Sequence, residues 1–201
     1  MKYPNTKKVI LEKSLDFFSK HGYAGASIRQ IAKAVGIRES AIYNHFKSKE
    51  EIFFEIISEY KSKDPVKDIL TDKLLDDLSD PKKFLFNFSK RIIEKWNEPE
   101  ERKFIRLVLM EQFIKVGSVE LSITEILSGF RSMCKMIFSE MIKAGVIKKL
   151  SPELLTEEFL TPLLSFRIEF LSDETTDYLD NAYDAAAKHV EFFWNAIKVQ
   201  L

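Results

Sequence analysis

The sequence predicts an all-α protein, and three observations lead to that prediction. Apolar residues recur every three to four positions through each long segment, as the 3.6-residue turn of a helix requires. The strict alternation of apolar and polar residues that marks a half-buried strand is missing from the sequence. The six glycines and six prolines stand mostly between the periodic segments, where these residues end helices.

Four short helices are expected within the first 60 residues. They span about 6–21, 27–35, 38–46 and 48–60. Gly22 ends the first of them, and Gly36 follows the second at the place where a left-handed C-cap is favoured. Ser27 and Ser48 each stand three residues before a Gln or a Glu, which is the spacing of a capping box. The second and fourth helices should therefore begin directly after these two serines.

The rest of the chain is expected to form longer helices. They span about 65–78, 81–97, 99–115, 119–144, 152–171 and 176–199. Asp80-Pro81 and Ser151-Pro152 each place a capping side chain before a proline in the first helical position. Gly117 and Gly145 stand at the ends of two other periodic segments. Together these helices predict a small N-terminal head that the fourth helix joins to an all-helical body.

Charge is divided unevenly along a chain whose formal net charge is zero. Residues 1–49 hold ten Lys/Arg and three Asp/Glu, whereas residues 50–201 hold 21 and 28. A basic end on an acidic chain is typical of a segment that binds a polyanion such as a nucleic acid. Chance clustering on a solvated face explains the charge count equally well, so charge alone leaves the choice open.

The compartment is predicted from what the sequence lacks. The N-terminus has no apolar signal segment, and no stretch approaches the roughly 18 uncharged apolar residues of a membrane span. Cys134 is the single cysteine, and it lies in an apolar helical stretch, so we expect a small buried hydrophobe rather than a redox sensor. A cytoplasmic protein without a membrane partner is the expected result.

Residues 27–46 predict a helix-turn-helix motif. Two short helices meet at a tight turn around Gly36, and Ala32 is small where the helices must approach closely. Ala41, Ile42 and Phe46 form the inward face of the second helix. The outward face is rich in donors and acceptors that can read base edges in the major groove: Arg38, Glu39, Ser40, Tyr43, Asn44 and His45.

This block resembles the tetracycline-repressor (TetR) family. The resemblance rests on residues 22–23, 27–32, 36–37 and 42–51, about a quarter of the chain. The rest resembles the family only in length and helix layout. The resemblance implies a DNA-binding domain over 1–49 and a helical ligand-binding and dimerisation domain over 50–201. Arg38 departs from the family pattern, which often has a Ser-like cap there.

The resemblance also implies roles for individual residues of the motif. Arg29 should reach a phosphate or a base, and Lys49 should meet a phosphate beside the N-terminus of the fourth helix. Tyr43 and His45 should hydrogen-bond the DNA backbone. The expected DNA-binding set is completed by Ser27 and Arg38 and by three candidate base readers: Glu39, Ser40 and Asn44. Glu39 has an alternative role, since an acidic side chain also favours a helix N-terminus through the helix dipole.

The last two helices are expected to form a homodimer. Segments 152–171 and 176–199 carry apolar residues on more than one face, which indicates packing on the same chain and on a partner. The resemblance implies that they pair with their mates in a four-helix interface. A wider core within one chain is the alternative.

A small apolar or aromatic ligand is the second expected partner of the body. The resemblance implies a ligand cavity between the fourth and eighth helices. An aromatic and methionine lining suits a flat apolar compound. The candidate lining residues are Trp96, Phe104, Met110, Phe113, Phe130, Met133, Phe138 and Phe166. Each of them has ordinary core packing as its alternative role.

These observations favour a transcriptional regulator, in the first instance a repressor that a small ligand releases from a palindromic operator. The alternative of the same class is a DNA-binding protein of the same fold without a small effector, whose body contacts a protein partner. An enzyme is not expected, because the sequence shows no Ser/His/Asp grouping, no metal-ligand spacing and no phosphate-binding glycine loop. No cofactor and no metal are expected. A helical carrier or scaffold would leave the basic head unexplained.

Overall fold

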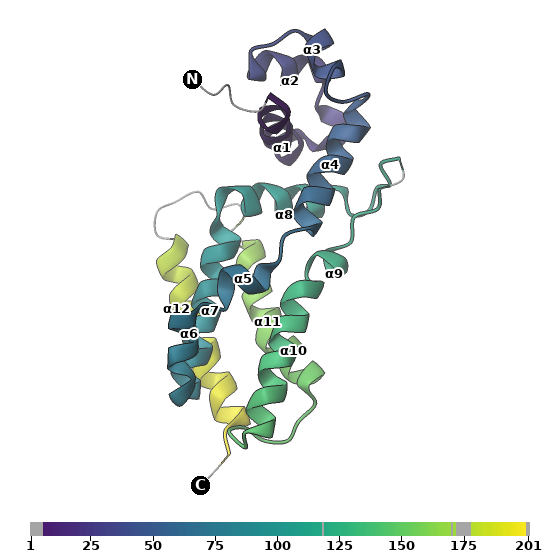
Figure 1. Cartoon of the computed structure of the whole chain (residues 1–201). Coiled ribbons are helices and arrows are strands. Elements are labelled where there is room, and N and C mark those ends of the chain that lie inside the picture. Colours follow the sequence, from purple (N-terminus) through teal and green to yellow (C-terminus); the bar gives the residue numbers. More distant parts are fainter. Residues whose placement is uncertain (1–5, 118, 170, 172–177, 200–201) are drawn as a thin grey trace. The chain divides into compact units, whose positions relative to one another are not determined.

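The computed structural model describes residues 6–117, 119–169, 171 and 178–199, and their regular structure is helical (Figure 1). Apart from helices, these residues form two isolated antiparallel bridges, Val116 with Val119 and Ile147 with Lys198. The predicted all-α fold is confirmed. The contacts divide the chain into two compact units, residues 1–63 with 99–126 and residues 64–98 with 127–201.

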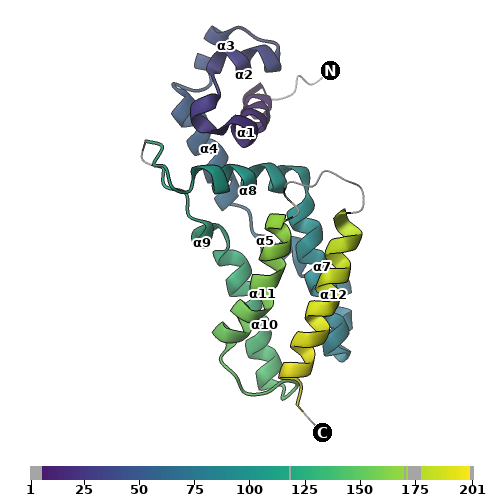
Figure 2. The ribbon, with the colours of Figure 1, turned by 180° about the vertical axis from the view of Figure 1, so that it is seen from behind.

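The first unit combines the N-terminal helices with a helix from the middle of the chain. Its helices are α1 (Thr6–Gly25), α2 (Ile28–Val35), α3 (Glu39–Tyr43), α4 (Lys49–Lys61), α8 (Pro99–Glu111) and α9 (Ile123–Ile126). Figures 1 and 2 show α8 lying beside α1. The compact unit that holds the motif therefore extends beyond residue 49. The assignment of DNA binding to residues 1–49, and of ligand binding and dimerisation to residues 50–201, stays a prediction.

Aromatic rings fill the interior of the first unit. The rings of Phe18 and Tyr23 lie 5.7 Å apart, and Tyr23 and Phe53 lie 5.1 Å apart. Tyr60 of α4 stacks on Phe104 of α8 and donates its hydroxyl to the buried carboxylate of Glu101. Burial of these rings contributes on the order of 2 kcal/mol each. This packing fixes α8 to α1 and α4.

The second unit contains the remaining helices. They are α5 (Pro65–Ile69), α6 (Asp72–Leu75), the 3-10 helix η1 (Asp76–Ser79), α7 (Pro81–Asn97), α10 (Ser128–Lys143), α11 (Pro152–Glu169) and α12 (Tyr178–Ile197). Helix α12 packs on α7 and α11, and α10 packs on α11 (Figures 1 and 2). The start of α7 confirms the predicted cap, since Asp80 accepts the N–H of Lys83 at 3.1 Å.

Phenylalanines form the core of this second unit. Phe159 lies 5.7 Å from Phe88, 5.5 Å from Phe138 and 5.4 Å from Phe193, measured between ring centroids. Cys134 is fully buried in the same unit, and burial raises the pKa of its thiol. The thiol is therefore protonated at neutral pH and packs as a small hydrophobe, as expected.

Three predicted helices differ from the structure. The segment 65–78 is not one helix, because the chain becomes extended at Thr71 (φ −93°, ψ 157°) and restarts as α6 and η1. The helices predicted over 99–115 and 119–144 are both shorter in the structure. Helix α8 ends at Glu111 and α10 begins at Ser128. Between them Gly117 adopts φ +58°, and Val116 and Val119 exchange backbone hydrogen bonds.

Smaller differences concern helix ends. Helix α3 stops at Tyr43 rather than residue 46, because the N–H groups of His45 and Phe46 both bond to the carbonyl of Ile42. Ser48 caps α4 as predicted, but the Glu51 side chain accepts the N–H of Lys47 rather than that of Ser48. Residues 170 and 176–177 of the predicted last two helices lie outside the described residues. No described helix is long and apolar enough to cross a membrane.

Candidate nucleic-acid interface

Local hydrogen bonds fix the geometry of the helix-turn-helix motif. Ser27 Oγ accepts the N–H of Gln30 at 3.3 Å, and Gln30 Oε1 accepts the N–H of Ser27 at 2.9 Å, so the predicted capping box is confirmed. Gly36 adopts φ +80°, and its N–H bonds to the carbonyl of Ala32 at 3.0 Å. A left-handed residue at this point turns the chain from α2 into α3 without strain only if it is glycine.

Helix α3 is anchored by its inward side chains and exposes the others. Ile42 and Phe46 are buried, and Ala41 is half-buried. Arg38 stands at the N-cap and makes no capping hydrogen bond with its side chain, as its departure from a Ser-like cap predicts. The predicted readers of α3 and its flanks are exposed: Arg38, Glu39, Ser40, Tyr43, Asn44 and His45.

Several exposed cations of the motif have no carboxylate partner among the described residues. Four of them form no ion pair within the described part of the chain: Arg29, Lys33, Arg38 and Lys47. Two lysines near the start of α1 differ, since Lys7 pairs with Glu55 at 2.5 Å and Lys8 with Glu12 at 3.8 Å. Exposed cations without a carboxylate partner are suited to phosphates. Lys33 and Lys47 were not among the DNA-binding residues predicted from the sequence, although their positions within the basic motif could have identified them.

Lys49 has partners inside the protein. Its ammonium donates to the carbonyls of Tyr23 (2.7 Å) and Ala26 (2.8 Å) and lies 4.2 Å from the centroid of the Tyr23 ring. Partial burial lowers the pKa of Lys49, and the negative charge of Glu111 opposes that shift. Lys49 therefore ties the segment before α2 to the start of α4, and the phosphate contact that the family resemblance implies is a competing role for the same ammonium.

The candidate ligand-lining residues do not all belong to one unit. Trp96, Phe130, Met133 and Phe138 are buried in the second unit, and Phe166 is half-buried there. The rings of Trp96 and Phe130 lie 5.3 Å apart.

The other three candidates belong to the first unit. Phe104 is buried under Tyr60, whereas Met110 is 41 % exposed and Phe113 is 88 % exposed. Five of the eight residues thus belong to the second unit, and their contact with a ligand stays a prediction. Among the described residues, no three His, Cys, Asp or Glu side chains are grouped so that they could hold a metal ion.

The segment that contains the helix-turn-helix motif is similar to known proteins. Residues 10–56 match the family described as bacterial regulatory proteins, tetR family. The HTH-type transcriptional repressor AcnR of Corynebacterium efficiens is 38% identical over 55 residues, which cover 27% of this chain and 29% of AcnR. The matched segment is thus less than a third of the length of that relative.

Solved structures resemble the chain over nearly its whole length. One of them is a TetR-family transcriptional regulator from Mesorhizobium loti, with a TM-score of 0.69 and 18% identity. The match covers 99% of this chain and 100% of that protein. The structure titled Flavonoid-responsive Regulator FrrA covers 98% of both chains, at a TM-score of 0.61 and 20% identity. At these identities the likeness shows that the fold is shared.

Proposed function

We infer from the membership of this chain in the tetR family of bacterial regulatory proteins that it is a DNA-binding transcriptional regulator. The observation that carries this proposal is the exposed surface of α2 and α3. There, cations that form no ion pair with any described residue flank the polar side chains of a short helix. A phosphate backbone supplies the missing negative charge, and the major groove admits such a helix.

Each exposed residue that the sequence predicted has a proposed part in binding. Arg29 and Arg38 contact phosphates and position the protein on the duplex. Tyr43 and His45 hydrogen-bond the DNA backbone, and Ser27 adds a contact at the start of α2. Sequence is read by Glu39, Ser40 and Asn44, for which cytosine and adenine are the preferred partners of Glu and Asn.

We propose that two chains act together through α11 and α12. Leu154 and Ile168 on α11 and Phe192 on α12 are large apolar side chains that one chain leaves more than half exposed. A partner that covers them gains about 25 cal/mol for each Å² of apolar surface removed from water. Ala186 is fully buried within its own chain, so it belongs to the core and is not available to a partner. A dimer presents two copies of α3, so the operator should be a pseudo-palindrome.

A repressor that a small ligand releases from DNA is the proposed mode of regulation. The names of two similar proteins support it, since AcnR is called a repressor and FrrA a flavonoid-responsive regulator. The proposed ligand is a flat apolar compound that contacts the aromatic and methionine side chains of the second unit.

The alternative is a regulator of the same fold without a small effector, whose body contacts a protein. Direct contacts between candidate lining rings and other aromatic rings favour this alternative, since Phe138 lies 5.6 Å from Phe193 and Trp96 lies 5.3 Å from Phe130.

Selection of binding sites from random duplex DNA tests the proposal. The wild-type protein should enrich a pseudo-palindrome whose half-sites lie about one helical turn, or a multiple of it, apart. Asn44→Ala should relax the preference at one base pair per half-site by about 1–3 kcal/mol. Arg29→Gln, the matched control, should weaken binding to all sequences about equally. A protein that binds neither selected nor random DNA at low salt would overturn the proposal.

A further inference from the structure

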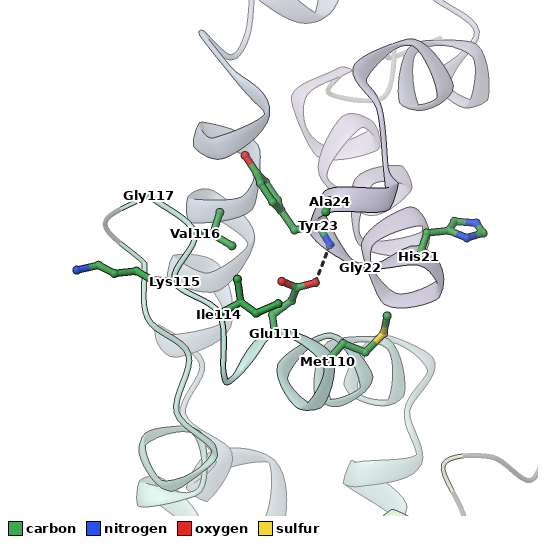
Figure 3. A pocket seen from close by; sticks show the side chains of 10 residues that line it. All are labelled: His21, Gly22, Tyr23, Ala24, Met110, Glu111, Ile114, Lys115, Val116 and Gly117. Carbon is green, nitrogen blue, oxygen red and sulfur yellow. Dashed lines mark hydrogen bonds between the residues drawn. The ribbon is translucent and has the colours of Figure 1, made fainter.

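The first unit contains a pocket apart from the helix-turn-helix surface. Its volume is about 430 Å³, and it lies between the end of α1 and the segment 110–117 (Figure 3). Its walls are mostly apolar, with Tyr23 and Ala24 on one side and Met110, Ile114 and Val116 on the other. A pocket of this size admits a small organic molecule.

One charged group, Glu111, is buried in the wall of this pocket. Only 5 % of the surface of Glu111 is exposed to solvent. Its Oε1 atom accepts the backbone N–H of Tyr23 at 2.8 Å, and no other described residue donates a hydrogen bond to it. In Figure 3 the second carboxylate oxygen points toward the side of the pocket that Ile114 and Val116 form.

No cation of the described chain neutralises this carboxylate at short range. None lies within 4.0 Å of it. Lys115 and His21 belong to the lining, but Figure 3 shows both side chains pointing away from Glu111. The ammonium of Lys49, which feels the charge of Glu111, is held by two backbone carbonyls.

The backbone beside Glu111 is shaped to let the carboxylate approach. Gly22 adopts φ +70°, a left-handed conformation that breaks the helical geometry of α1. A Cβ atom at this position would lie 2.8 Å from Glu111 Oε1, which is too close for a real contact. Only glycine combines this φ with this clearance. The carboxylate is therefore held at a defined place rather than left on a loose surface chain.

We propose that this pocket binds a small organic ammonium ion with an apolar or aromatic group. An ionised carboxylate accepts up to about four hydrogen bonds, and Glu111 receives one. Buried charges in proteins are paired, and a carboxylate among apolar walls attracts a cation more strongly than one in water. The ammonium binds the second oxygen of Glu111, and the apolar group covers Met110, Ile114 and Tyr23. This site lies in the first unit, and the inference does not rest on the proposed regulatory function.

Titration of the full chain with benzylammonium, followed through backbone amide resonances, tests the site. The amide resonance of Tyr23 should move with saturation, because its N–H donates to the same carboxylate. Benzyl alcohol, which has the same ring without the charge, should bind at least about tenfold more weakly. Equal affinity for the two probes, or no binding of benzylammonium up to about 10 mM, would overturn the proposal.

Variants locate the binding to Glu111. Glu111→Gln keeps an acceptor for Tyr23 and removes the charge, so affinity for benzylammonium should fall about tenfold or more. Glu120→Gln makes the same charge change at an exposed position and should leave the affinity unchanged. If Glu111→Gln fails to fold, Ile114→Trp replaces it, since Ile114 is 57 % exposed and a larger ring there fills the pocket. Unchanged affinity in Glu111→Gln or Ile114→Trp would refute the site.

Discussion

Replacement of Lys49 by methionine separates two roles of this residue. Lys49→Met keeps an unbranched apolar side chain of similar reach and removes the ammonium that donates at 2.7 and 2.8 Å to the carbonyls of Tyr23 and Ala26. A hydrogen bond from a charged donor contributes about 1.5–3 kcal/mol when buried, and less here because the residue is only partly buried. We expect the free energy of unfolding to fall by about 2 kcal/mol, which lowers Tm by about 4–8 °C.

Lys49→Met should affect the salt dependence of DNA binding differently from the replacement of an exposed cation. Because the ammonium of Lys49 is already held by carbonyls, Lys49→Met should leave the slope of log K against log salt concentration unchanged. Arg29→Gln should reduce the magnitude of that slope by about one unit and leave Tm unchanged, since Arg29 is exposed and forms no ion pair among the described residues.

Thermal unfolding measures Tm, and DNA titrations at four or more salt concentrations measure the slope of log K against log salt concentration. The reasoning fails if Lys49→Met flattens the salt dependence by about one unit without lowering Tm. That result would assign Lys49 to a phosphate contact, as the family resemblance implies. It would also mean that the hydrogen bonds of Lys49 to the carbonyls of Tyr23 and Ala26 do not stabilise the fold.

Three further predictions concern stability, assembly and pH. Gly22→Ala should cost about 2 kcal/mol or more, because its Cβ meets Glu111 Oε1 at 2.8 Å, whereas Gly36→Ala, with nothing within 4 Å of its Cβ, should cost about 1 kcal/mol in urea titrations. Phe192→Glu, at a side chain that is 76 % exposed, should shift sedimentation from dimer to monomer without loss of helical circular dichroism; a persistent dimer would contradict the proposed interface. Burial lowers the pKa of His189, so protonation favours the unfolded chain and stability should decline as pH falls below about 6.5. His189→Gln should reduce the loss of Tm between about pH 7.5 and 5.5, and an unchanged pH profile would refute this assignment.

Features that depend on residues within one helical turn were predictable from the sequence. The capping box of Ser27 and Gln30, the left-handed Gly36 and the start of α7 after Asp80 all agree with the structure. Their energies arise from hydrogen bonds and φ preferences that neighbours along the chain decide. For the same reason the outward residues of α3 could be named, because helical periodicity places them opposite the buried Ile42 and Phe46.

Features that depend on distant residues were decided by the tertiary structure alone. Glu111 and Tyr23 are 88 positions apart, so no local pattern predicts their hydrogen bond, and Glu111 looked like one charge within an apolar run. The ammonium of Lys49 turns toward carbonyls 23 and 26 positions earlier, and the place of this residue at the start of α4 gave no sign of this. The partition of the candidate ligand-lining residues follows from α8 packing on α1. Each of these contacts requires two elements to meet in space, and packing, rather than local preference, decides which elements meet.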